Sequence, residues 1–313
     1  MTREAVSTET VSAGAVYRGM DQATLDRQYS PSSRVPSLAA YLALYERRSA
    51  AARRDHPVRA GLRYGPHPAE LLDYFPGRPG PGPGRPPLLV FVHGGNWQAL
   101  GRAESAFPAP PLLRAGAAVA VVGYGLAPGT GLDAMAGMVR RAVGRLLDRA
   151  EELGFASDRL YLCGTSAGAH LAAMALLPGP YAEPAGGPDV SGRIAGAVLL
   201  SGMYDLEPVR LSYVNEALRL DEPAALRNSP LHRLPERLPP VVMARGGNET
   251  EEYVRQHERM VAALRGRTEV AEVVAERHDH FDLPGDLGVR GTELGDTVLG
   301  LLGLGPERGG TTG

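Results

Sequence analysis

The sequence contains no lysine, one cysteine and one tryptophan, and it lacks any long uninterrupted apolar segment. Since all 33 basic residues are arginine, chemistry through a lysine Schiff base or a lysine general base is excluded. The lone Cys163 excludes an internal disulfide and a cysteine-rich metal site. No apolar run approaches the roughly 18 residues of a membrane span, and the first residues lack a secretory signal pattern. We therefore expect a cytoplasmic protein with no membrane partner.

Charge is nearly balanced, with 33 basic residues against 35 acidic residues and a net charge of −2. A balance of this kind gives no indication of a nucleic-acid partner, so we expect a small molecule as the partner. The chain has 313 residues, of which 43 % are apolar, and this is sufficient for a large hydrophobic core.

Continuous apolar runs alternate along the chain with segments of helical periodicity. Such runs are typical of strands buried on both faces of a parallel sheet. The predicted strands are 62–64, 71–75, 88–92, 117–122, 160–163, 195–200, 240–244 and 270–275. The predicted helices include 21–54, 131–154, 251–264 and 292–302. This alternation indicates an α/β fold with a doubly wound, mostly parallel sheet and helices on both faces.

These patterns predict a single domain over residues 21–303. Residues 1–20 are polar and rich in serine and threonine, so we expect a flexible N-terminus there. Residues 304–313 are expected to form a flexible tail. The irregular, polar segment 206–237 is expected to be a small cap-like insertion over the edge of the sheet where the parallel strands end.

Residues 160–171 are predicted to form a buried strand, a Gly-x-Ser-x-Gly turn and an apolar helix. A nucleophile elbow requires this order, because the serine stands on a sharp turn at the end of a strand. Gly164 and Gly168, on either side of Ser166, leave room for such a turn. The N–H of Ala167, which begins the helix, is placed to stabilise an oxyanion. The pattern therefore predicts Ser166 as a catalytic nucleophile.

The loop after the strand 88–92 reads His93-Gly94-Gly95-Asn96-Trp97. Two glycines directly after a strand allow the N–H groups of Gly94 and Gly95 to face a developing negative charge, although an ordinary tight turn is the alternative interpretation. We expect His93 to brace this loop. Asn96 and Trp97 are expected to contact the substrate, with Trp97 at the mouth of the pocket or, alternatively, in the core.

A general base is expected late in the chain, after the nucleophile and the acid. Two histidines, His278 and His280, follow the last predicted strand. Phe281 could anchor this loop so that the ring of His280 faces inward, which favours His280 as the base and leaves His278 as the alternative. Two further histidines, His232 and His257, are expected to be solvated.

The orienting acid is expected in the loop after the strand 240–244. Glu249 lies at the turn into the next helix, where its carboxylate could accept the Nδ1–H of the base. Asp205, after the preceding strand, is the alternative acid. The chain order Ser166, Glu249, His280 is the order found in α/β-hydrolases.

The pairing of His93-Gly94-Gly95-Asn96-Trp97 with Gly164-Thr165-Ser166-Ala167-Gly168 resembles the kynurenine formamidase (arylformamidase) branch of the α/β-hydrolases. That branch carries His-Gly-Gly-x-Trp where the lipase and esterase branch carries His-Gly-Gly-Gly. Three further segments are similar to motifs of the branch: Leu25-Asp26-x-x-Tyr29, Glu249-Thr250-x-x-Tyr253-x-x-Gln256 and His280-Phe281. The resemblance spans about residues 20–303. It departs from the family at one point, because the family often has aspartate where this chain has Glu249.

The resemblance implies Ser166 as nucleophile, Glu249 as acid and His280 as base, with oxyanion donors from Gly94, Gly95 and Ala167. The implied reaction cleaves the formamide of an N-formyl aromatic amine such as N-formylkynurenine through an acyl-enzyme. It releases formate and needs no metal or organic cofactor. A role in secondary-metabolite biosynthesis is a further hypothesis. Homodimers are common among such enzymes, so a homodimer is one expected assembly.

Two other functions remain open on the same scaffold. A carboxylesterase of broad specificity would use the same groups on an ester. A non-hydrolytic biosynthetic enzyme, such as a cyclase, dehydratase or acyltransferase, could keep the oxyanion hole without forming an acyl-serine. A non-enzymatic binding module is disfavoured, since such proteins usually lack the serine or the histidine, and Ser166 and His280 are both present.

Overall fold

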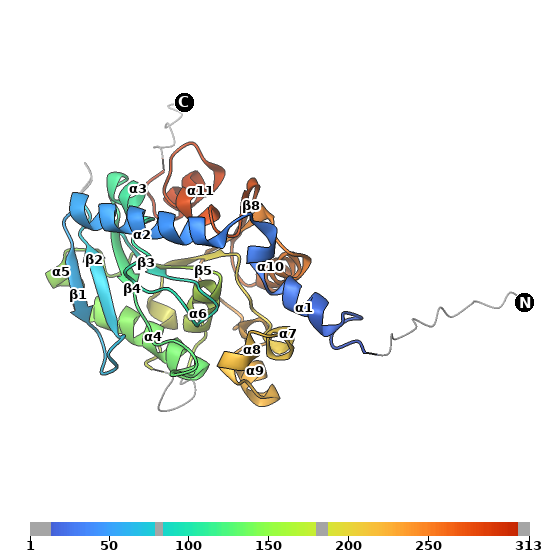
Figure 1. Cartoon of the computed structure of the whole chain (residues 1–313). Helices are drawn as coiled ribbons and strands as arrows, with labels where there is room; N and C mark the ends of the chain where they lie inside the picture. The colour runs from blue at the N-terminus through green and yellow to red at the C-terminus, as the bar shows by residue number, and fades with distance from the viewer. Residues whose placement is uncertain (1–13, 79–83, 180–186, 306–313) are drawn as a thin grey trace, which may run out of the picture.

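An eight-stranded sheet runs through the centre of the molecule (Figure 1). The computed structural model describes residues 14–78, 84–179 and 187–305. In sheet order, its strands are β1 (Arg59–Arg63), β2 (Leu71–Phe75), β4 (Ala118–Val122), β3 (Leu88–Val92), β5 (Leu160–Thr165), β6 (Gly196–Leu200), β7 (Val241–Asn248) and β8 (Val270–Asp279). β2 pairs antiparallel with both β1 and β4, and all other neighbours are parallel. The mostly parallel sheet predicted from the sequence is confirmed.

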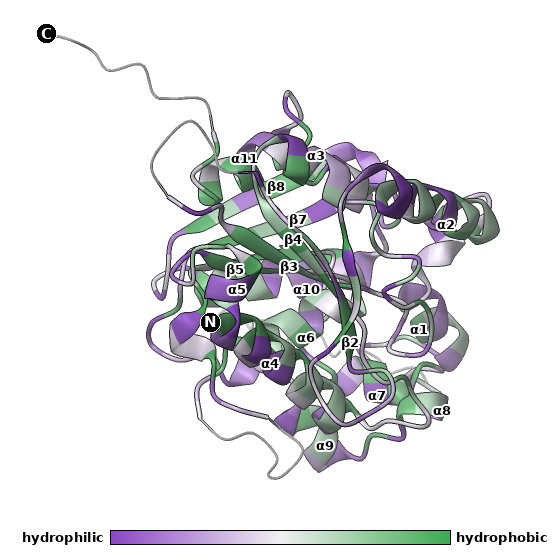
Figure 2. Ribbon diagram, turned by 90° about the vertical axis from the view of Figure 1, so that its left-hand side faces the viewer, coloured by the Kyte–Doolittle hydropathy of each residue, from purple (hydrophilic) through white to green (hydrophobic). Residues whose placement is uncertain are grey.

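Helices cover both faces of the sheet, which is why its inner strands are apolar along their whole length. All residues of β3, β4 and β6 are buried. Alternate residues of β3 enter two separate core clusters. One cluster includes residues of α4 (Leu132–Asp148), α6 (Ala167–Ala175) and α10 (Glu251–Leu264), and the other includes residues of α3 (Ala109–Arg114) and α11 (Glu293–Leu301). Figure 2 shows the apolar strands enclosed between these helices.

The N-terminal segment, predicted as one helix over 21–54, is divided into three. It forms α1 (Gln22–Gln28), the 3-10 helix η1 (Pro31–Arg34) and α2 (Leu38–Asp55). Proline lacks an N–H and disfavours helical backbone at the residue before it, so Pro31 and Pro36 interrupt the helix. In Figure 1, α2 lies along the outside of the sheet and α1 lies beside α10.

The segment 206–237 carries only short helices, namely α7 (Glu207–Leu211), α8 (Asn215–Leu218), α9 (Glu222–Arg227) and η3 (Pro230–His232). The remaining short elements are α5 (Ala150–Leu153), η2 (Ser191–Arg193) and η4 (Leu283–Asp286). Figure 1 shows α7, α8 and α9 gathered on one side of the molecule, next to α6 and α1. Tyr213, between α7 and α8, reaches the cavity described below.

The two ends of the chain were expected to be flexible. Within residues 14–20, a bridge between Tyr17 and Met20 closes a turn. Residues 1–13 and 306–313 lie outside the described residues, so for them the expectation stays a prediction. Within the described ranges, no helix combines the length and the apolar character needed to cross a bilayer.

Candidate active site

Ser166 stands on a sharp turn between β5 and α6, as the Gly-x-Ser-x-Gly pattern predicts. Its φ of 54° and ψ of −122° lie outside the regions that residues other than glycine usually occupy. Strain of this kind is typical of functional turns. A Cβ on Gly164 would lie 2.2 Å from Gly168 O, and a Cβ on Gly168 would lie 2.1 Å from Val92 O. The turn therefore requires both glycines.

The loop after β3 lies directly against this elbow. A Cβ on Gly94 would lie 3.1 Å from the Cβ of Ser166, and Gly94, Gly95 and Ser166 line the same cavity. The N–H of Ala167 is among the first N–H groups of α6, which have no partner within the helix. The helix dipole adds positive potential at that end. This arrangement can direct three N–H groups at one oxyanion.

His93 and Tyr124 fix the peptide planes of the loop. Burial lowers the pKa of His93 to about 4, so its ring is neutral near pH 7. Because a carbonyl oxygen only accepts, the 2.8 Å contact between His93 Nδ1 and Gly94 O places the proton on Nδ1. The Tyr124 hydroxyl donates to His93 O at 2.9 Å. Since the N–H of a trans peptide points opposite to its C=O, these bonds turn the N–H groups of Gly94 and Gly95 away from His93 and Tyr124.

Extended pairing between β7 and β8 brings the candidate acid and base together. Each strand runs four residues beyond its predicted end, and the last residues of the two strands pair with each other. Gly246 and Gly247 permit this close pairing. A Cβ on Gly246 would lie 2.6 Å from His278 O, and a Cβ on Gly247 would lie 2.4 Å from Glu276 O. The residues that follow, Glu249 and His280, are therefore neighbours.

Glu249 and His280 make direct contact in a buried setting. The two carboxylate oxygens of Glu249 lie 3.2 Å and 3.1 Å from His280 Nδ1. Ser201 Oγ donates to Glu249 Oε1 at 2.6 Å. The side chains of Glu249 and His280 are 0 % and 5 % exposed. A carboxylate in this place holds the imidazole proton on Nδ1 and leaves Nε2 able to accept a proton.

The ring of Tyr253 contacts the histidine, and its hydroxyl donates to Met203 Sδ at 3.4 Å. Its ring meets the ring of His280 edge-on, with centroids 4.8 Å apart and an interplanar angle of 78°. Burial raises the pKa of the Tyr253 hydroxyl, and the charge of Glu249 adds to this. In the sequence Tyr253 was only part of a motif. Its helical spacing to the buried Met260 and Leu264 was the available signal for an inward-facing residue.

Comparison with known proteins identifies the family. The kynurenine formamidase of Danio rerio is 36 % identical over 281 residues, which cover 85 % of this chain and 92 % of that protein. The kynurenine formamidase of Salmo salar is 34 % identical, with 92 % of this chain and 98 % of that protein covered. The chain belongs to the kynurenine formamidase family.

Two further comparisons agree with a hydrolase of the α/β-hydrolase fold. The family model described as BD-FAE matches residues 78–183 of this chain. Among solved structures, a protein of Silicibacter sp. TM1040 that was proposed to be a thioesterase superposes with a TM-score of 0.75 at 26 % identity. The match covers 88 % of this chain and 98 % of that structure.

Two motifs that resemble the kynurenine formamidase family contact each other across the N-terminal end of α10. Thr250 Oγ1 donates to Gln28 O at 2.6 Å. The Tyr29 hydroxyl accepts from Gln256 Nε2 at 3.0 Å and donates to Glu252 Oε2 at 3.2 Å. The motif in α1 therefore anchors the helix that follows the candidate acid.

The N-terminal helix α2 also supports the loop that carries His280. The Tyr41 hydroxyl donates to Asp279 Oδ2 at 2.5 Å, and the Tyr45 hydroxyl donates to the backbone oxygen of Phe281. The sequence indicated Tyr41 and Tyr45 only as apolar positions on a helix. No spacing rule connects them with residues more than 200 positions away.

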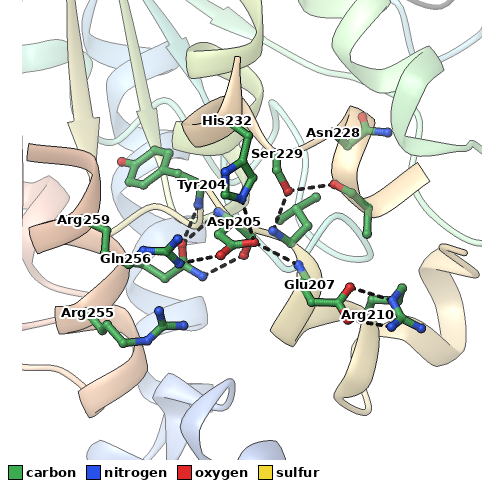
Figure 3. Close-up of polar contacts among 12 residues, drawn as sticks. Tyr204, Asp205, Glu207, Arg210, Asn228, Ser229, His232, Arg255, Gln256 and Arg259 are labelled. Atoms are coloured by element: carbon green, nitrogen blue, oxygen red, sulfur yellow. Dashed lines mark hydrogen bonds and ion pairs between the residues drawn. The ribbon is translucent and has the colours of Figure 1, made fainter. Parts of the chain in front are cut away.

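Asp205, the alternative acid, is engaged elsewhere (Figure 3). Its Oδ2 accepts from Arg259 Nη1 at 2.5 Å, and its Oδ1 lies 3.4 Å from His232 Nε2. Burial by itself would raise the pKa of Asp205, but the hydrogen bond and charge of Arg259 outweigh it, and the pKa is lowered. Asp205 thus joins the loop after β6 to α10 and η3, and it is not the partner of His280.

We expect Asp205→Asn to weaken folding and to leave hydrolytic activity intact. Loss of a charge-assisted hydrogen bond to Arg259 should lower the free energy of unfolding by about 1–3 kcal/mol at pH 7. Because the folded-state pKa is depressed, the stabilisation is full above the unfolded-state pKa of about 3.9 and is lost as pH falls through the lower folded-state value. Urea titrations of the unaltered protein and of Asp205→Asn, at pH 7 and at acidic pH, measure the free energy of unfolding. If the two proteins differed by the same amount at both pH values, the prediction would be contradicted.

Two places were expected for Trp97, the mouth of the pocket or the core, and the structure places it in the core. Its side chain is fully buried, its Nε1 donates to His170 Nδ1 at 3.3 Å, and it is not among the residues that line the cavity. Asn96, one residue earlier, does line the cavity. A φ of 50° at Asn96 and of 59° at Trp97 turns the backbone so that the two side chains diverge.

Two other histidines differ from the chosen base in their surroundings. His278, the alternative base, lies on β8 with its Nε2 3.2 Å from Asp286 Oδ2 and not against Glu249. His257 was expected to be solvated, but its side chain is 1 % exposed and its Nε2 lies 3.2 Å from Glu272 Oε1. The buried face of α10 therefore includes a histidine with no part in the site.

A cavity of about 310 Å³ opens beside Ser166, Gly94, Gly95 and His280. Its opposite wall is built by η1, α2 and Phe281, and so by parts of the chain far from the elbow in sequence. In the described ranges, no group of three or more His, Cys, Asp or Glu side chains has a geometry that could hold a metal ion. The cavity thus brings together the candidate nucleophile, a histidine paired with a carboxylate and the glycines of the candidate oxyanion loop.

Proposed function

We propose that this protein hydrolyses the formamide bond of an N-formyl aromatic amine, such as N-formylkynurenine, and releases formate. The pairing of His280 with Glu249 at 3.1 Å, beside the cavity that also exposes Ser166, is the observation that carries the proposal. Membership of the kynurenine formamidase family supports the formamide as the bond that is cleaved.

In the first half of the reaction, Ser166 Oγ attacks the formyl carbon and His280 Nε2 takes the hydroxyl proton. The carbonyl oxygen becomes an oxyanion and accepts hydrogen bonds from the N–H groups of Gly94, Gly95 and Ala167. Glu249 holds the resulting imidazolium in place and stabilises its charge. The protonated His280 then gives its proton to the departing nitrogen, the C–N bond breaks, and the free aromatic amine leaves.

In the second half, water hydrolyses the formyl ester on Ser166. His280 takes a proton from the water as its oxygen bonds to the formyl carbon, and it returns that proton to Ser166 Oγ as formic acid leaves and loses its remaining proton to solvent as formate. A free aromatic amine is a suitable precursor for secondary metabolites, which supports a biosynthetic role for the reaction.

Ester hydrolysis is the second candidate, because the same groups act on an ester and the solved relative from Silicibacter was proposed to be a thioesterase. We expect kcat/KM on N-formylkynurenine or on 2-formamidoacetophenone, whichever is better, to reach at least the value for p-nitrophenyl acetate. Since an aryl ester is intrinsically more reactive than a formamide, equal values already indicate formamide specificity. A preference for the ester by several orders of magnitude would make the protein an esterase.

A further inference from the structure

Among the described residues, neutral side chains and the imidazole of His280 line the cavity beside Ser166. No arginine, aspartate or glutamate lines it in the described part of the chain, and the chain has no lysine. Its apolar lining comes from Pro31, Leu38, Leu42, Tyr45, Leu100 and Phe281. Ser32, Asn96 and Gln98 contribute neutral polar groups. A substrate carboxylate or ammonium group would therefore find no opposite charge in the lining.

Arg34, one of the arginines that lie two positions from a lining residue in sequence, contacts the end of β7. Arg34 follows the lining residues Pro31 and Ser32, and its Nε donates to Asn248 Oδ1 at 3.1 Å. Asn248 Nδ2 in turn donates to Arg34 O at 2.9 Å. The two residues hold η1 against the end of β7, so Arg34 has a structural use.

The rim of the cavity exposes apolar surface. Leu38, Leu42 and Tyr213 are each 37 % exposed, and all three line the cavity. In the described residues only two other large hydrophobic side chains are exposed, Val16 and Leu226. Leu38 and Leu42 are four positions apart on α2 and so share one helical face. Clustered exposed apolar side chains at the rim of a cavity are typical of a surface that a ligand covers.

We propose that the substrate carries an uncharged apolar body next to its reacting group, and that this body covers Leu38, Leu42 and Tyr213. The inference rests on the proposed formamide hydrolysis and narrows its substrate class to neutral N-formyl arylamines. A zwitterionic amino-acid group, as in N-formylkynurenine, would lose its hydration when it packs against the leucine side chains. It would gain no charged partner in return. An alkyl or aryl group in the same place gains by burial.

The test compares substrates that share one leaving group. N-formylkynurenine is a 2-formamidophenyl ketone with an amino-acid side chain, and 2-formamidoacetophenone, 2-formamidobutyrophenone and 2-formamidohexanophenone replace that side chain with neutral alkyl groups. Since the aniline that leaves is nearly the same, kcat/KM reports the contribution of the side chain. We expect every neutral ketone to exceed N-formylkynurenine. The value should rise by about fourfold for each methylene group that reaches the leucines.

A matched pair of variants locates the effect. Leu42→Ser should reduce the rise per methylene group, because it removes apolar surface from the rim. Leu226→Ser removes an exposed leucine on α9 that is not part of the cavity lining, and it should leave the whole series unchanged. An equal reduction in both variants would contradict a role for the rim.

Acetate esters of the corresponding 2-hydroxyphenyl ketones separate the two proposals. If the formamides are inert and the esters show the same rise with chain length, formamide hydrolysis is wrong and the apolar substrate body stands. If N-formylkynurenine equals or exceeds the neutral ketones, the uncharged body is overturned while formamide hydrolysis stands. No rise with chain length in either series overturns the apolar body.

Discussion

Replacing Ser166 by alanine is expected to lower kcat on the formamide substrate by about 10³-fold or more, because the nucleophile of the acyl-enzyme is lost. Residual turnover would come from the oxyanion donors and from substrate binding alone. Steady-state kinetics on the purified variant measure the effect. The same variant should show no mass increase after incubation with a phenylmethylsulfonyl-type serine reagent, whereas the unaltered protein should gain one adduct on the peptide that contains Ser166.

Ser191→Ala is the control for this experiment. Ser191 Oγ donates to Asp189 away from the cavity, so its loss should affect neither turnover nor labelling. Near-normal turnover by the Ser166→Ala protein would exclude an acyl-serine. It would indicate that water attacks the formyl carbon directly, without a covalent intermediate on Ser166.

Replacing Glu249 by glutamine is expected to lower kcat by about 10⁴-fold with little change in KM. Glutamine keeps the size of the side chain, but it cannot stabilise the imidazolium that His280 becomes when it takes the proton of Ser166. The amide can also offer an N–H to Nδ1, which would favour the wrong tautomer of the ring. Steady-state kinetics on the formamide measure the loss, and circular dichroism checks that the fold is kept.

Two further variants bracket this prediction. Glu249→Asp shortens the acid by one methylene group and retains its charge, so it should keep more activity than the glutamine variant. Asp205→Asn removes the alternative acid and should retain full turnover, since Asp205 pairs with Arg259 and His232. The reverse pattern, with activity lost in Asp205→Asn and kept in Glu249→Gln, would make Asp205 the acid.

The centre of the fold was predictable because its strands are apolar on both faces. β3 covers the predicted residues, and the helix predicted over 251–264 matches α10. The ends of β7 and β8 were not predictable in this way, since their last residues are polar or glycine and most of them are not buried. Only the pairing of two distant segments shows that these residues are strands, and no local pattern encodes that pairing.

His257 was misjudged from its chemistry, and for Trp97 the sequence left two places open. The helical period that places Tyr253 and Met260 inward also places His257 inward, so the burial of His257 was predictable from spacing. The expectation of a solvated side chain relied on its polar character instead. For Trp97, the deciding feature is a pair of positive φ values at Asn96 and Trp97, which residues other than glycine seldom adopt. A sequence pattern gives no signal for such a backbone.

The surface helix α2 supplies Leu38 and Leu42 to the rim of the cavity, while Tyr41 and Tyr45 on the same helix bond to the segment that carries His280. Under the two proposals, one peripheral helix outside the sheet would contribute both to substrate preference and to the placement of the base. Evolution could retune what the enzyme accepts by altering two leucines, with the two tyrosines kept. Exchanging α2 between homologues should then exchange their substrate specificities.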